Sequence, residues 1–174
     1  MNLIVGAPWW LVAFLCLLLV AAAVEDAIRL KISNLTCIAV FVGALVAMAV
    51  HGFSWPLWQN GLVCLVILVI GTPLFAAGWL GGGDVKLLAA LGTWLNLSAA
   101  VGLIVAVLLA GGLISVVYIV IWRMTGRRRQ SGNRIPYGLA IAAGAFFIVG
   151  VQWNTRPSNP FIDHLRAIQT TKHA

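Results

Sequence analysis

The chain of 174 residues is 62% hydrophobic and only 9% charged, and its mean hydropathy is +1.04. Soluble domains are about 45–50% apolar and about 25% charged, so this composition argues against a soluble globular enzyme. Eleven lysines and arginines against four acids give a net charge of +7, which we attribute to basic loops beside anionic lipid. We expect membrane lipid around the chain and no nucleic-acid partner.

Apolar runs close to the length of a membrane span, about 20 residues, follow one another along the chain. They predict an all-α integral membrane protein with about six transmembrane helices, at residues 9–24, 35–50, 59–80, 85–97, 98–122 and 136–153. The run at 85–97 is short and could cross only if the preceding glycines begin at membrane depth. We expect a transmembrane domain over residues 1–153 and a polar tail over 154–174.

Lysines and arginines in short loops indicate the orientation. They lie between spans one and two, after span three, and above all between spans five and six, where five arginines gather. These three connections are expected in the cytosol and both termini outside, although the tail carries three further basic residues.

The remaining residue types predict no metal or cofactor. The three cysteines lie singly in apolar runs and the three histidines are dispersed, which disfavours a metal site, a disulfide framework or a histidine-based triad. No Gly-Lys-Ser/Thr phosphate loop is present. Eight tryptophans fall near span ends, and we interpret them as anchors in the interfacial aromatic belt.

Two of the four acids occupy positions that suggest chemistry. Asp26 follows span one and Asp84 follows span three, so the predicted topology places both at the cytoplasmic side and at similar depth. Ionisable groups at membrane depth are costly and usually functional. Two carboxylates that approach closely share a proton, so that one can activate water while the other polarises a carbonyl. This pattern points to aspartic proteolysis.

The glycines Gly81, Gly82 and Gly83 precede Asp84 directly. We expect them to adopt backbone conformations closed to other residues and to let an extended substrate approach the carboxylate. A peptide must be unwound before hydrolysis, and a flexible segment at the membrane edge suits that need.

Structural interpretations of the same residues remain open. Asp26 and Arg29 could form a solvated pair near a helix end. Asp84 could cap the following helix, where a carboxylate satisfies free N–H groups. Glu25 neighbours Asp26 but points to a different helix face, and we expect it to be solvated.

The segment Gly81-Gly82-Gly83-Asp84-Val85-Lys86-Leu87-Leu88-Ala89-Ala90-Leu91-Gly92 resembles the GxGD signature of type IV prepilin peptidases. Asp26 to Asn34 is similar to the family's first-aspartate segment, which ends in Ile-Pro-Asn. Ile135 to Ile141 resembles its Pro-Tyr-Gly segment. Ser33 replaces the usual proline, which we expect to loosen the turn after Asp26.

The resemblance implies that Asp26 and Asp84 are a catalytic pair that removes the leader of type IV, Flp-like prepilins and pseudopilins on the cytoplasmic side of the bacterial inner membrane. The Cys-x-x-Cys extension of bifunctional relatives is missing, so the resemblance implies the short, peptidase-only branch without methyltransferase activity. It also suggests that Pro136, Tyr137 and Gly138 pack near the site; otherwise this segment only begins a helix. Lys86 either meets the substrate's polar leader, lowers a carboxylate pKa or is a topology anchor.

A rival function is a proton-coupled carrier or channel component, in which Asp26 and Asp84 relay protons. Transporters are expected to show repeats and interrupted helices in both halves, whereas one Gly-rich break is visible here. A structural membrane protein without activity is the third alternative. The oligomeric state is not predicted.

Overall fold

The computed structural model describes residues 2–52, 57–124 and 137–155, apart from the side chains of residues 118 and 122. All regular structure in these ranges is helical, as predicted. The helices in chain order are α1 (Leu3–Gly6), α2 (Trp9–Arg29), α3 (Asn34–His51), α4 (Trp58–Ala76), α5 (Gly82–Gly92), α6 (Leu97–Met124) and α7 (Tyr137–Asn154).

Five helices of the described chain are long and apolar enough to cross a membrane: α2, α3, α4, α6 and α7. The predicted run at 85–97 is different, because its helix α5 has only 11 residues. At 1.5 Å per residue it is about 16 Å long, roughly half of a hydrocarbon core of about 30 Å. The predicted polar tail lies outside the described residues from residue 156 onward.

The short helix α5 is the centre of the bundle. It packs against α3 and α4 and also contacts α7, while α7 packs against α2 and α6. From Leu87 to Gly92 every residue of α5 is buried, which explains why this part of a short helix is entirely apolar. Close approach of α4 depends on Gly71, where an added Cβ would lie 2.5 Å from a Val85 methyl group.

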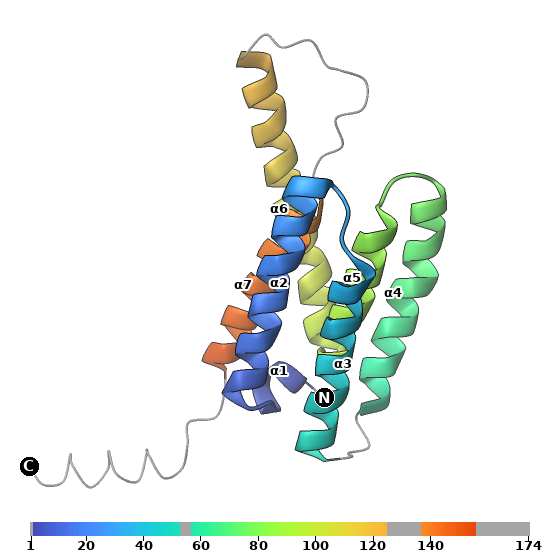
Figure 1. The fold of residues 1–174 in the computed structure, drawn as a ribbon, viewed down its shortest axis with the longest axis vertical. Helices are drawn as coiled ribbons and strands as arrows, with labels where there is room; N and C mark the ends of the chain where they lie inside the picture. Colours follow the sequence, from blue (N-terminus) through green and yellow to red (C-terminus); the bar gives the residue numbers. More distant parts are fainter. Residues whose placement is uncertain (1, 53–56, 125–136, 156–174) are drawn as a thin grey trace, which may run out of the picture.

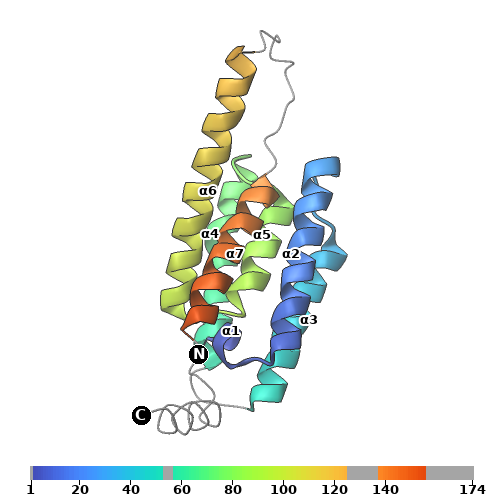
Figure 2. The ribbon, with the colours of Figure 1, turned by 90° about the vertical axis from the view of Figure 1, so that its left-hand side faces the viewer.

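The connections of the bundle gather at two ends. The α2–α3 and α4–α5 connections lie at one end, at the top of Figure 1, and α1 lies at the opposite end. The last turns of α6 project beyond the other helices at the top end, which Figure 2 shows from the side. The two segments that carry the aspartates are therefore on the same side of the molecule.

The interpretation of the tryptophans as surface anchors is wrong for Trp94. Its side chain is fully buried, and its indole N–H donates a hydrogen bond of 2.9 Å to the Val40 carbonyl of α3. Trp9, Trp58 and Trp79 are 57–78% exposed, in keeping with the interpretation. The apolar sequence around Trp94 does not distinguish the two environments.

Candidate active site

Asp26 lies in the last turns of α2, where its side chain is only 5% exposed. Its Oδ2 accepts a hydrogen bond of 2.6 Å from the Gly138 N–H at the start of α7. An added Cβ at Gly138 would lie 2.8 Å from that oxygen, so the contact requires a glycine. The buried Asp26 carboxylate is thus directed toward α7 and is not a solvated group.

The helix that carries Asp26 ends immediately after it. Leu30 adopts the left-handed conformation (φ 52°), and its N–H donates to the Asp26 carbonyl at 2.8 Å. A left-handed non-glycine residue costs roughly 1–2 kcal/mol. The chain therefore turns sharply out of α2 and returns toward α3 through Ile32, which is buried.

Asp84 lies in the first turn of α5 and is 8% exposed. Its Oδ2 accepts a hydrogen bond of 3.1 Å from the Gly81 N–H, so the carboxylate does cap its own helix. Burial raises the pKa of the Asp84 carboxyl to about 6, the negative charge of Asp26 adds to the rise, and the Gly81 N–H opposes it. The Asp84 side chain therefore both caps α5 and interacts with the charge of Asp26.

Two helices bring the aspartates together. Helix α3 packs against both α2 and α5, and α7 packs against α2 while contacting α5. Because the charge of Asp26 contributes to the raised pKa of Asp84, the carboxyls are near enough to interact. The site is a pair of buried carboxyls from different helices at one end of the bundle.

The glycine cluster serves close approach, not unusual backbone angles. The positive-φ glycines of the described chain are Gly52 and Gly78, so the expectation of special conformations at residues 81–83 is wrong. An added Cβ at Gly83 would lie 3.0 Å from the Ile32 side chain and 3.3 Å from its backbone. Gly83 therefore lets the Asp84 segment touch the chain that follows Asp26.

The supporting residues divide into those near the carboxyls and those that are not. Gly138 contacts Asp26 directly, whereas the Tyr137 hydroxyl lies 3.0 Å from the position of an added Cβ on Gly111 of α6. Lys86 is exposed and donates to the Asn34 side chain at 2.9 Å. Pro136 lies outside the described residues.

The prediction that Glu25 is solvated is wrong, because its half-buried side chain is bonded to the start of α3. Its carboxylate accepts hydrogen bonds from the Ser33 N–H at 2.8 Å and from the Thr36 hydroxyl at 3.1 and 3.2 Å. These partners come from the start of the next helix, so the neighbours of Glu25 on its own helix do not reveal them. The Ser33 and Thr36 hydroxyls, three residues apart at a helix start, were the available signal.

No group of three or more histidine, cysteine, aspartate or glutamate side chains that could hold a metal ion occurs among the described residues. One carboxylate can accept a proton from water while a protonated partner donates one, which is general acid–base chemistry on a carbonyl.

The fold and the site define a helical membrane protein with two buried, interacting carboxyls at one end of its bundle. The sequence model of the type IV leader peptidase family matches residues 13–120, more than half of the chain, and the chain belongs to this family. It is therefore a peptidase of the membrane. The matched range includes both aspartates and ends before Gly138. No curated protein and no solved structure matches the chain.

Proposed function

We propose that the protein is an aspartic endopeptidase that removes the leader of type IV, Flp-like prepilins and pseudopilins. Asp26 and Asp84 are its catalytic residues, and it needs no metal or cofactor. The observation that carries the proposal is the burial of both carboxyls at one end of the bundle, with Asp26 contributing to the raised pKa of Asp84. Family membership favours peptide hydrolysis over the proton-relay alternative.

The two carboxyls would divide one proton between them. In the proposed cycle Asp84, whose pKa is raised to about 6, holds the proton, and Asp26 starts as the carboxylate. Asp26 accepts a proton from water as the water oxygen bonds to the scissile carbonyl carbon. Asp84 donates its proton to the carbonyl oxygen, which gives a neutral gem-diol.

The gem-diol collapses when its C–N bond breaks. Asp26 returns the proton to the leaving amine nitrogen, and Asp84 recovers a proton from a diol hydroxyl as the new carboxyl forms. Both side chains finish in their starting protonation states. Each needs only to accept and return one proton, a contribution typically worth about 10²–10⁴-fold in rate.

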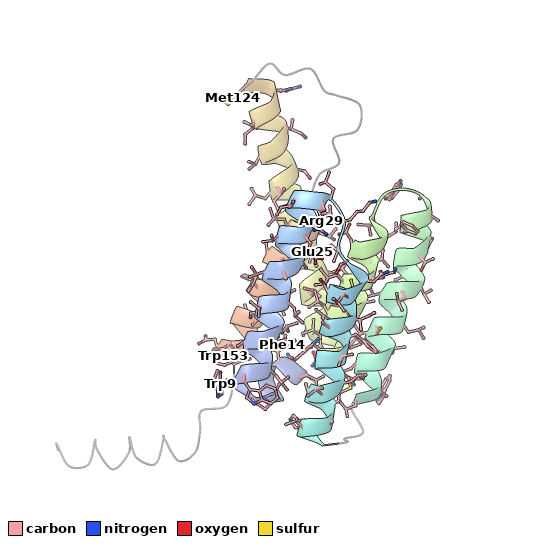
Figure 3. All side chains as sticks on the ribbon, viewed as in Figure 1. Trp9, Phe14, Glu25, Arg29, Met124 and Trp153 are labelled. Atoms are coloured by element: carbon pink, nitrogen blue, oxygen red, sulfur yellow. The ribbon has the colours of Figure 1, made fainter. Side chains whose placement is uncertain are left out.

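The orientation is also part of the proposal. Arg29 and Lys86, which we expect in the cytosol, are three and two residues from Asp26 and Asp84 in the sequence. The end of α6 at Met124 is on the same side of the molecule as Arg29 (Figure 3). The first described residues, in α1, are at the opposite end. This supports cleavage at the cytoplasmic face of a bacterial inner membrane with both termini outside.

The test is leader cleavage of a co-expressed Flp-type prepilin by wild type, Asp26→Asn and Asp84→Asn at matched membrane levels. Asparagine keeps the size of the side chain and removes its titration. We expect each variant to lose cleavage by at least about 100-fold, since each lacks a proton-transfer group. Normal processing by both variants would overturn the proposal.

A further inference from the structure

Glu25 joins the end of α2 to the start of α3. Figure 3 shows its side chain near the same end of α2 as Arg29, beside the connection to α3. Its Oε2 accepts the Ser33 N–H at 2.8 Å, and both of its oxygens lie within 3.2 Å of the Thr36 hydroxyl. One carboxylate therefore holds two residues that are eight and eleven positions further along the chain.

The hydroxyls of Ser33 and Thr36 complete this arrangement. The Ser33 hydroxyl oxygen accepts the Thr36 N–H at 3.1 Å, and the two hydroxyl oxygens are 3.0 Å apart. Since the Thr36 hydroxyl donates to Glu25, the Ser33 hydroxyl is left to donate to Thr36. Thr36 is buried, so a lost partner there is costly. Glu25, Ser33 and Thr36 thus form a single hydrogen-bonded unit, which we call the Glu25 clasp.

The chain held by the Glu25 clasp is the chain that touches the Asp84 segment. Ile32 precedes Ser33 and packs on Gly83, where an added Cβ would lie 3.0 Å from the Ile32 side chain. Asn34 follows Ser33 and accepts the hydrogen bond from Lys86. The Cys37 thiol lies 3.8 Å from the Gly83 carbonyl oxygen. Each of these contacts joins the start of α3 to the first turn of α5.

Glu25 is adjacent to Asp26 in the sequence, so the Glu25 clasp connects the Asp26 segment with the Asp84 segment. Because Glu25 and Asp26 are adjacent on α2, a change in the position of Glu25 also shifts Asp26. The chain at Ser33, which Glu25 holds, lies beside residues that contact Gly83 and Lys86 near Asp84. We propose that Glu25 is a positioning residue of the peptidase, which holds the Asp26 and Asp84 segments in register through Ser33 and Thr36. The inference rests on the proposed function.

Ser33 is central to the clasp because its N–H is the closest donor to Glu25. Its backbone has φ −71° and ψ 146°, angles that proline also adopts. A proline here would have no N–H to donate, and its ring would occupy the place of that hydrogen. The Glu25 clasp therefore requires a residue other than proline at this position, and serine provides the hydroxyl as well.

The decisive experiment compares Glu25→Ala with Glu25→Gln in the purified full chain, using a prepilin peptide that contains leader and cleavage site. We expect Glu25→Ala to lower kcat by about 10-fold or more with KM within about twofold, because small misplacement of reacting groups is costly. Glu25→Gln should keep kcat within about threefold, since its amide can accept the Ser33 N–H and donate to Thr36.

Arg29→Gln is the matched control, because it changes a charge one turn further along α2 at an exposed side chain. We expect it to leave kcat and KM within about twofold of wild type. If Glu25→Ala does not reach the membrane, Glu25→Gln and Thr36→Val still test the clasp. Thr36→Val removes the hydroxyl that donates to Glu25 and should lower kcat by about threefold to tenfold.

A second measurement uses Ser33→Pro as background. Because proline removes the N–H that Glu25 accepts, Glu25→Ala should cost no more than about threefold in kcat in that background. An equal cost in both backgrounds would overturn the proposal, as would wild-type kcat for Glu25→Ala. Equal loss in Glu25→Ala and Glu25→Gln would instead make Glu25 a proton-transfer group.

The outcomes separate this inference from the proposed function. If Asp26→Asn and Asp84→Asn are inactive while Glu25→Ala has wild-type kcat, the positioning role alone fails. If the aspartate variants cleave normally, the proposed function fails whatever Glu25 does.

Discussion

The two ends of α5 differ in the kind of polar group that they bury. At its C-terminal end Trp94 and Asn60 are fully buried, and their polar groups are neutral and paired with the carbonyls of Val40 and Thr93. At its N-terminal end the buried polar group is the ionisable carboxyl of Asp84, and Gly81 and Lys86 nearby in the sequence are exposed.

This contrast shows how a short helix can place a costly group. A buried carboxyl close to a second one is unfavourable once both are ionised. The neutral end, where Trp94 packs over Gly43 and the Leu3 N–H donates to the Trp94 carbonyl, provides packing that offsets that cost. We call these the anchor end and the reactive end of α5, and the following variants test the distinction.

The largest effect is expected at the anchor end. Trp94→Ala should lower the free energy of unfolding by about 3–5 kcal/mol, because it leaves a cavity and removes the indole hydrogen bond to the Val40 carbonyl. Unfolding in mixed micelles by a denaturing detergent measures it. Trp9→Ala, at a side chain that is 70% exposed, is the control and should change stability by less than about 0.5 kcal/mol. Equal stabilities would contradict an anchor role.

At the reactive end we expect a substitution to raise the free energy of unfolding instead of lowering it. The raised pKa of Asp84 means that the folded state holds this proton up to about pH 6, whereas an unfolded aspartate releases it near pH 4. The stability from this group is therefore fully present below about pH 4 and is lost as the pH rises to about 6 and above.

Asp84→Asn should remove that dependence. Relative to wild type it should gain on the order of 1–3 kcal/mol between pH 4 and pH 7, measured by the same unfolding assay. Asp163→Asn changes an acid of the polar tail and serves as the control for net charge. A wild-type curve parallel to that of Asp84→Asn over this range would show that Asp84 is ionised without penalty.

The contact between Gly138 and Asp26 tests the reactive end without changing a carboxyl. Gly138→Ala places a methyl group 2.8 Å from Asp26 Oδ2, so the carboxylate must move. We expect leader cleavage to fall about 100-fold, since misplacement of about 1 Å has effects of that size. Gly150→Ala on the same helix has nothing within 4 Å and should cleave normally. Similar rates for both would remove Gly138 from the site.

The smallest effect is expected for Lys86→Met. The Lys86–Asn34 hydrogen bond is exposed, and exposed pairs typically contribute about 0–1 kcal/mol. Cleavage should fall no more than about fivefold, with Lys31→Met as a control at another exposed lysine. A fall of about 100-fold in kcat/KM that comes from a raised KM, with kcat unchanged, would indicate that Lys86 binds the substrate leader.

Much of the fold follows from apolar run length alone. The runs at 9–24, 35–50, 98–122 and 136–153 coincide with helices α2, α3, α6 and α7, because a span needs a continuous apolar segment and little else. The same rule is wrong about α5. A helix buried among other helices can be apolar on all sides and still be short, so hydropathy does not reveal its length.

The candidate site divides in the same way. Scarcity of acids and their equal predicted depth pointed to Asp26 and Asp84, because charge in an apolar chain is costly and is seen in the sequence directly. The partners of these residues were not visible there. The bonds from Gly138 to Asp26 and from Ser33 to Glu25 join residues that are 112 and 8 positions apart.

The amino-acid sequence is enough to predict a helical membrane protein, its two aspartates and the resemblance to prepilin peptidases, since composition, run length and local motifs are properties of neighbouring residues. The bonds of Glu25, the burial of Trp94 and the close contacts of residues 81–83 are visible in the three-dimensional fold alone. Those properties depend on which helices meet. The meeting of α2, α3, α5 and α7 at one end is set by packing across the whole chain.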